Sequence, residues 1–178
     1  MNIINYDVNT TTLTVSATAD LTDLTVSQYQ LMLIDILDKQ TTAYILGNYP
    51  QHKQLSDHVD LQYWGGWLQN NNSSYTTQYI YATTYINAYN IATGNTTLQD
   101  AINEQPSDEQ IGWAHLFSAS VRIGWVKAVK DVYNYYYNEI MNQTTISELE
   151  TIDINSITYP TFIDVSTLTT SASASASG

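Results

Sequence analysis

The sequence predicts a mainly α-helical protein: a helical bundle with one long C-terminal helix, a short N-terminal β hairpin or arm, and an extended C-terminal arm. Apolar residues recur every three or four positions over several stretches between Ser27 and Asn142. An alternating Thr-rich segment precedes this region, and a Ser-Ala tract ends the chain. We therefore divide the chain into an N-terminal segment (1–26), a helical domain (27–142) and a C-terminal arm (143–178).

The N-terminal third begins in a β pattern and changes to a helical one. Residues 1–26 alternate apolar side chains with Thr and Asn, which favours a short hairpin or an extended arm. From Ser27 a broad apolar stripe with helical spacing begins, and Gly47 followed by Pro50 predicts where it stops.

The middle of the chain predicts shorter helices. Residues 50–72 form one whose C-terminal end should be disturbed by Gly65 and Gly66. The Tyr-rich stretch that ends at Gly94 predicts a helix buried on more than one side, and residues 97–105 predict one or two further turns.

The longest predicted helix runs from Ser107 to Asn142. Ser107 can cap it, Gln110 can close a capping box, and Asp108 and Glu109 suit the positive first turn. An apolar stripe follows along most of its length. At 1.5 Å per residue such a helix is about 50 Å long, which suits packing against several elements or against another subunit.

After Asn142 the pattern predicts an extended arm. Its first part carries apolar residues among Thr, Ser and Asp, enough to dock on a surface. The end, Thr170 to Gly178, offers nothing large enough to bury, so we expect it to become ordered only on a surface provided by a neighbouring chain.

Composition indicates an assembly subunit and argues against several other classes. Only 12% of the residues are charged, and the net charge is -12. Uncharged polar and Tyr-rich surfaces are cheap to bury in an interface, whereas a strongly acidic chain repels nucleic acid. Three basic residues, Arg122, Lys127 and Lys130, fall close together, but local pairing with acids such as Asp131 is favoured over a phosphate-facing patch.

Further classes are excluded by what the sequence lacks. With no cysteine, disulfides, thiolate chemistry and the usual structural zinc ligands are excluded. No apolar stretch is long enough to span a membrane, and no N-terminal basic segment precedes an apolar run, so synthesis in a cytoplasm is expected.

The search for catalytic or metal-ligating residues gives no site. The three histidines are His52, His58 and His115, and Asp57 and Asp60 flank His58. An exposed polar turn is favoured over a metal patch there, and no nucleophile or phosphate-loop motif is present. We expect no enzymatic activity, no cofactor and no metal.

Aromatic and apolar side chains supply the interface candidates. Consecutive tyrosines on a helix diverge by about 100° each, which disfavours a shared sugar-stacking platform and favours core and subunit packing. A receptor- or carbohydrate-binding surface stays open as the alternative. The candidates are Trp64, Trp67, Tyr133, Tyr136, Tyr137, Tyr159, Phe162 and Ile163.

Two stretches resemble a short module of bacteriophage tail and tail-fibre-associated proteins. The first is Ile45-Leu-Gly-Asn-Tyr-Pro-Gln-His-Lys-Gln54, and the second is Arg122-Ile-Gly-Trp-Val-Lys-Ala-Val-Lys130. In that module Tyr-Pro-x-Trp-Lys-Gln closes one helix, and a later helix carries an Ala-Val-Arg-like segment. His52 stands here where the module has Trp, and the two stretches lie further apart.

The resemblance implies a structural virion protein rather than a catalytic one. We expect a subunit of a phage tail, neck (head-tail connector) or fibre attachment, located in the virion and synthesised in the host cytoplasm. Its partners would be other virion proteins and copies of itself, with no nucleic acid bound and no membrane span. The alternatives are a receptor- or carbohydrate-binding module and a small hydrolase with a pocket around His58 or His115.

Overall fold

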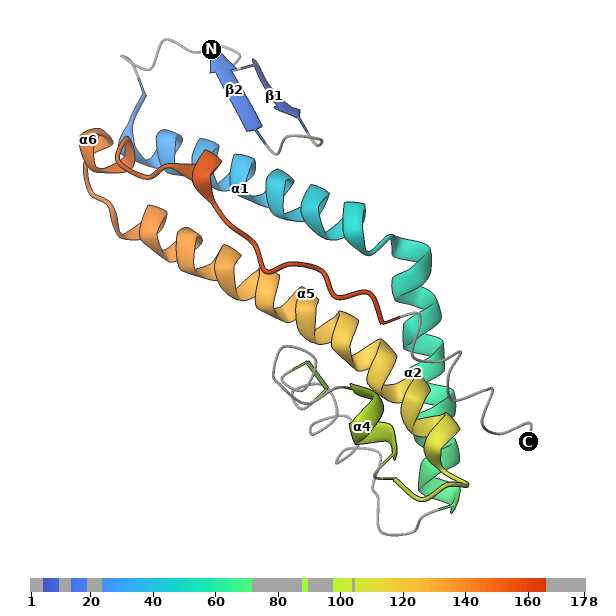
Figure 1. The fold of residues 1–178 in the computed structure, drawn as a ribbon. Coiled ribbons are helices and arrows are strands. Elements are labelled where there is room, and N and C mark those ends of the chain that lie inside the picture. Colours follow the sequence, from blue (N-terminus) through green and yellow to red (C-terminus); the bar gives the residue numbers. More distant parts are fainter. Residues whose placement is uncertain are drawn as a thin grey trace. The chain divides into compact units, whose positions relative to one another are not determined.

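The computed structural model is mainly helical, which confirms this part of the predicted fold class (Figure 1). It contains helices α1, α2, α4, α5 and α6, the 3-10 turn η2, and the short paired strands β1 and β2. The structure describes residues 24–71, 88–89, 98–103 and 105–165 and, as backbone alone, residues 5–9 and 14–18.

Contacts group the chain into two compact units. Unit 1 comprises Met1–Asn48 and Ala128–Pro160, and unit 2 comprises Tyr49–Lys127 and Thr161–Gly178. The long helix α5 (Gln110–Asn142) contributes residues to both units. The segment boundaries and the bundle arrangement expected from the sequence stay predictions.

At the N-terminus the structure describes two strands. Strand β1 (Asn5–Asn9) pairs antiparallel with β2 (Thr14–Thr18), and Asn5 lies opposite Thr18 in the register. Residues 10–13, which would close a hairpin, lie outside the described residues, so the expected hairpin or arm stays a prediction.

Helix α1 (Val26–Asn48) follows the predicted stripe closely. Thr25 caps its start, because the Thr25 hydroxyl accepts a hydrogen bond from Gln28 N at 3.3 Å and Gln28 Oε1 accepts one from Thr25 N at 2.9 Å. The helix stops at Asn48, two residues before Pro50, as the sequence predicts.

In unit 1, α1 packs with the last turns of α5 and with the short helix α6 (Ile146–Leu149). Gln30 of α1 donates from Nε2 to the carbonyls of Ile140 at 3.2 Å and Gln143 at 3.0 Å. The amide thereby binds carbonyls at and just beyond the C-terminal end of α5, where the regular helical hydrogen bonds stop. The buried core of the unit consists of Tyr29, Leu33, Ile36, Leu37, Ile140, Leu149 and Ile154.

Unit 2 contains helix α2 (Gln51–Asn71), the short helix α4 (Leu98–Asn103) and the first turns of α5. The one or two turns predicted at 97–105 are thus confirmed. Its described core includes Leu61, Leu68, Ala88, Ile102, Trp113, Leu116, Phe117, Val121 and Val165.

The predicted disturbance of α2 at Gly65 and Gly66 is wrong, because the helix continues without a break to Asn71. Two glycines cost a helix roughly 2 kcal/mol in propensity. Leu61 and Leu68 on the buried face are 2% and 0% exposed and hold the helix through this stretch.

The predicted start of the long helix also needs correction. Residues 107–109 form a turn, and α5 begins at Gln110. The Gln110 amide donates to the carbonyls of Gln105 at 3.0 Å and Asn103 at 3.4 Å instead of closing a capping box with Ser107. The end at Asn142 is as predicted.

The predicted extended arm is interrupted by two short helical turns. Helix α6 has a complete capping box, in which Glu148 N donates to Thr145 Oγ1 at 3.3 Å and Glu148 Oε2 accepts from Thr145 N at 3.0 Å. Turn η2 (Ile154–Ser156) follows, capped by Asp153. Residues 157–165 are irregular, whereas the Ser-Ala end and the Tyr-rich stretch ending at Gly94 fall largely or wholly outside the described residues.

Candidate functional site

A buried ion pair lies inside unit 2. Arg122 donates from Nε to Asp57 Oδ2 at 2.5 Å and from Nη2 to Asp57 Oδ1 at 2.7 Å. The Tyr49 hydroxyl donates to the same Oδ2 at 2.6 Å. All three residues are buried, at 6%, 2% and 2% exposure for Arg122, Asp57 and Tyr49. The contact between Arg122 and Asp57 is bidentate, which is a strong and geometrically specific form of an arginine–carboxylate pair.

Burial and charge shift the proton affinities in this cluster. Burial, reinforced by the hydrogen bond to Asp57 and its charge, raises the pKa of Tyr49 far above the ordinary 10.0. For Arg122, burial alone would lower the pKa, but the hydrogen bond and charge of Asp57 keep it above the ordinary value. The tyrosine therefore stays a neutral donor and the arginine a cation.

Local structure places each member of the cluster. Tyr49 lies between α1 and α2, where its carbonyl accepts from Gln54 Nε2 at 2.7 Å. Asp57 follows on the buried side of α2, and Arg122 lies on α5. Phe162 stacks on the Tyr49 ring with centroids 6.3 Å apart. Apolar surroundings keep water from the ion pair and strengthen it.

The sequence-based interpretation missed this cluster. It grouped Arg122 with Lys127 and Lys130 and favoured pairing with a nearby acid such as Asp131, but Arg122 is buried against Asp57 whereas the two lysines are exposed. It also considered Asp57 beside His58, yet His58 is exposed and its ring contacts Gln62 at 3.2 Å. An arginine three or four residues from apolar helix positions is the signal that could have indicated burial.

Trp64 and Trp67 lie together on α2. The Trp64 ring stacks on the His115 ring, with centroids 4.7 Å apart and an interplanar angle of 11°. The Trp67 ring packs edge-on against the Trp64 ring, with centroids 5.6 Å apart. Both rings are half-buried against the core of unit 2. Next to them, Tyr63 is 62% exposed and contacts Trp64 edge-on. The aromatic group therefore extends from the core of unit 2, at Trp64 and Trp67, to the solvent-exposed Tyr63.

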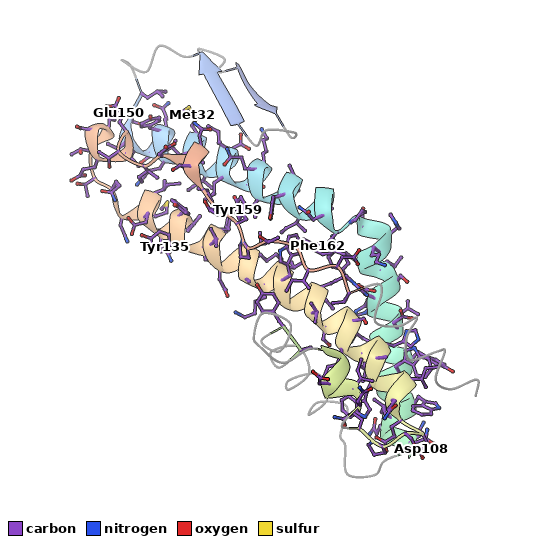
Figure 2. The ribbon with its side chains drawn as sticks, viewed as in Figure 1. Met32, Asp108, Tyr135, Glu150, Tyr159 and Phe162 are labelled. Atoms are coloured by element: carbon purple, nitrogen blue, oxygen red, sulfur yellow. The ribbon has the colours of Figure 1, made fainter. Side chains whose placement is uncertain are left out.

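The tyrosine candidates on α5 divide between core and solvent. Tyr133 and Tyr136 are half-buried against the core of unit 1. Tyr137 stacks on Tyr133 with centroids 6.1 Å apart and is 37% exposed. Tyr135, labelled in Figure 2, is 59% exposed. Neighbouring tyrosines on α5 thus differ in burial, as expected for side chains that point in different directions around a helix.

Three candidates follow in the C-terminal segment. Tyr159 (Figure 2) is 8% exposed in unit 1, where its hydroxyl lies 2.7 Å from Thr41 Oγ1 and its ring stacks on Tyr44 at 4.9 Å. Phe162 and Ile163 are half-buried in unit 2, with Phe162 edge-on to Trp125 at 4.9 Å. The apolar side chains of this part of the arm thus pack against other residues of the same chain.

Several large apolar side chains stay exposed. On α2, Leu55 is 65% exposed and Val59 is 55% exposed, and both share a helix row with Tyr63. Leu31 on α1 is 66% exposed, and Met141 on α5 is 47% exposed. Singly exposed apolar side chains such as Leu31 and Met141 are common on protein surfaces, whereas a contiguous group can mark a contact surface.

Neither a metal cluster nor a membrane span is found in the described part of the chain. There, no group of three His, Cys, Asp or Glu side chains is placed to hold a metal ion. None of its helices combines the length and the apolar character that crossing a bilayer requires. Comparison of the chain with protein-family models, curated proteins and solved structures finds no match.

Proposed function

We propose that this chain is a structural virion protein, a subunit of a phage tail, neck or fibre attachment. The observation that carries the proposal is the meeting of two distant stretches, residues 45–54 and 122–130, which resemble one phage module. Tyr49 from the first stretch and Arg122 from the second bind the same carboxylate, that of Asp57. The two stretches that resemble the phage module are thus joined through one carboxylate, and this supports the view that the resemblance reflects a common structural unit.

The chemistry of the cluster also favours a structural role. The Asp57 carboxylate accepts three hydrogen bonds and is 2% exposed, so it has no open side for a substrate. A general acid or base must reach the proton it transfers. The cluster therefore suits a brace between α2 and α5 within unit 2, and we propose that the protein has no enzymatic activity and needs no cofactor or metal.

The surface supports contact with other proteins. Exposed Leu55, Tyr63 and Tyr135 offer apolar and aromatic area, of the kind that interfaces use. A net charge of -12 disfavours binding to nucleic acid. We propose that the partners are other virion proteins and copies of this chain, with assembly after synthesis in the host cytoplasm.

The proposal is tested by asking whether the protein is part of a particle. Particles would be banded on a density gradient from cells that carry this gene, washed with detergent and salt, and quantified by mass spectrometry. We expect the chain at a fixed ratio to the other particle proteins. Its recovery only in the particle-free fractions would overturn the proposal.

A second candidate function rests on the exposed aromatic residues. Tyr63 stands edge-on to Trp64 at 5.1 Å and presents its ring to solvent, as a sugar-stacking residue does. This favours a receptor- or carbohydrate-binding module of a viral or surface assembly. A glycan array with the wild-type chain and Tyr63→Ala decides between the two: signals lost in the variant support the module, and no signals from either exclude it.

A further inference from the structure

The last described residues of the chain form a short segment that packs on unit 2. Residues 161–165 follow Pro160, the last residue of unit 1, and belong to unit 2. Ile163 packs against the core of that unit, in which Val165 is 2% exposed, whereas Thr161 and Asp164 are exposed. We call residues 161–165 the C-terminal strap.

Phe162 (Figure 2) attaches the strap beside the buried ion pair. Its ring stacks on the Tyr49 ring, with centroids 6.3 Å apart, and packs edge-on against the Trp125 ring, with centroids 4.9 Å apart. The hydroxyl of the same Tyr49 donates to Asp57 Oδ2, and Asp57 is paired with Arg122. The strap therefore covers the aromatic side of the Tyr49–Asp57–Arg122 cluster.

Side chains rather than regular secondary structure hold the strap in place. Residues 157–165 belong to no helix, strand or turn of the described chain. Ordering any segment costs backbone entropy, which helical residues offset with a hydrogen bond to the next turn as well as by burial. The strap offsets this cost mainly through Phe162, Ile163 and Val165, of which Val165 is buried and the other two are half-buried. Its attachment is therefore weaker than that of a helix in the same unit.

The residues just before the strap are fixed within unit 1. The Tyr159 hydroxyl lies 2.7 Å from Thr41 Oγ1, and the Tyr159 ring stacks on the Tyr44 ring. The Tyr44 hydroxyl donates to the Pro160 carbonyl at 3.1 Å. None of these contacts involves the strap, so they can persist when the strap leaves unit 2. Opening therefore requires a change of backbone conformation only from Thr161 onward.

We propose that the strap is a lid that opens on its own while the helices of unit 2 stay folded, and whose closure keeps water from the Tyr49–Asp57–Arg122 cluster. Segments with few buried contacts open locally at a lower free-energy cost than the whole domain unfolds. Water that reaches the ion pair weakens it, because the attraction between two charges falls as the local dielectric constant rises. The strap thus controls how firmly Asp57 of α2 holds Arg122 of α5. This inference concerns the conformation of the chain itself and does not depend on the proposed virion role.

Cysteine labelling measures the opening, because the sequence has no cysteine of its own. Val165→Cys reports on the strap. Val121→Cys is the matched control, since Val121 is 0% exposed on α5 in the same core cluster. Thr161→Cys, at an exposed position of the strap, gives the rate for an accessible thiol. With DTNB, Val165→Cys is expected to react at least about a hundredfold faster than Val121→Cys and at least about tenfold more slowly than Thr161→Cys.

The urea dependence of labelling distinguishes local opening from unfolding. Local opening exposes little surface, so the rate for Val165→Cys should hardly change at low urea concentrations, whereas the rate for Val121→Cys should rise steeply. Equal rates for these two variants, with the same steep urea dependence, would overturn the proposal, because Val165 would then become accessible only when unit 2 unfolds. A rate for Val165→Cys equal to that of Thr161→Cys would show that the strap is not closed.

Phe162→Ala tests whether the aromatic ring holds the lid shut. Added to Val165→Cys, it removes the ring contacts of the strap and should speed labelling by about tenfold or more. Thr161→Ala is the control, because it changes an exposed strap residue and should leave the labelling rate of Val165→Cys nearly unchanged. Similar labelling rates in the two backgrounds would overturn the role of Phe162.

The shielding of the ion pair is tested by a double-mutant cycle. The coupling between Asp57→Leu and Arg122→Met is measured by urea unfolding in the wild-type chain and again in the Phe162→Ala background. Expressed as a ratio of unfolding equilibrium constants, it should fall by about tenfold or more in that background, because water reaches the pair. In the Thr161→Ala background the coupling should keep its wild-type value. A coupling that Phe162→Ala leaves unchanged would refute the shielding.

Discussion

Removing one partner of the buried ion pair should destabilise unit 2 far more than removing both. In Asp57→Leu the Arg122 guanidinium would stay buried, at 6% exposure in the wild type, without its carboxylate. Loss of one member of a buried pair costs about 3–5 kcal/mol. Because a typical domain is stable by only about 5–15 kcal/mol, the loss is a large part of the total.

The double variant is expected to behave differently from the single ones. Arg122→Met should also cost about 3–5 kcal/mol, since it leaves Asp57 with the Tyr49 hydroxyl as its remaining donor in the cluster. Asp57→Leu combined with Arg122→Met removes both charges and fills the space with apolar atoms. Its free energy of unfolding should lie no more than about 1 kcal/mol below the wild-type value, so the coupling energy between the two substitutions should be at least about 5 kcal/mol.

Urea unfolding followed by tryptophan fluorescence measures these changes directly. All four tryptophans, Trp64, Trp67, Trp113 and Trp125, belong to unit 2, as does the ion pair. The control is Lys39→Met, which breaks a half-exposed helix pair with Asp35 and should cost no more than about 0.5 kcal/mol by circular dichroism. Single variants that each cost less than about 1 kcal/mol, with additive effects, would refute the reasoning.

Three further predictions concern other contacts. Tyr159→Phe removes a buried hydroxyl contact and should lower the free energy of unfolding by about 1 kcal/mol in chemical denaturation; no change would show that the contact contributes nothing. Hydrogen bonds from Thr144 and Thr145 lower the pKa of Glu148 below 4.5, so its cap stabilises α6 above pH 4.5 and is lost as the pH falls through the lowered pKa; a carboxyl NMR titration with a midpoint at or above 4.5 would contradict this. Gly66→Ala meets nothing within 4 Å and should raise the melting temperature through helix propensity, whereas the Cβ of Gly112→Ala lies 3.0 Å from the Trp67 ring and should lower it; equal shifts of the same sign would argue against the packing.

The positions of the main helices could be predicted from the sequence because their signals are local. Periodic apolar residues predicted α1, α2 and α5, and the end of α1 before Pro50 follows from steric rules on the preceding residue. Capping was predicted less well, because Gln110 can bond to whichever carbonyls the preceding loop presents, and here these belong to Gln105 and Asn103.

Two features depend on contacts between residues far apart in the sequence, and local patterns did not predict them. Gly65 and Gly66 remain helical because Leu61 and Leu68 are buried on the core side, a gain that outweighs poor propensity. Arg122 was expected to pair with a nearby acid such as Asp131, but its partner in the structure is Asp57, 65 positions earlier in the sequence. The sequence by itself determined the mainly helical class, the net negative charge and the positions of the main helices, because these follow from composition and from local periodicity. Only the folded chain decided which charge is buried and with which partner, because that depends on residues that meet in space.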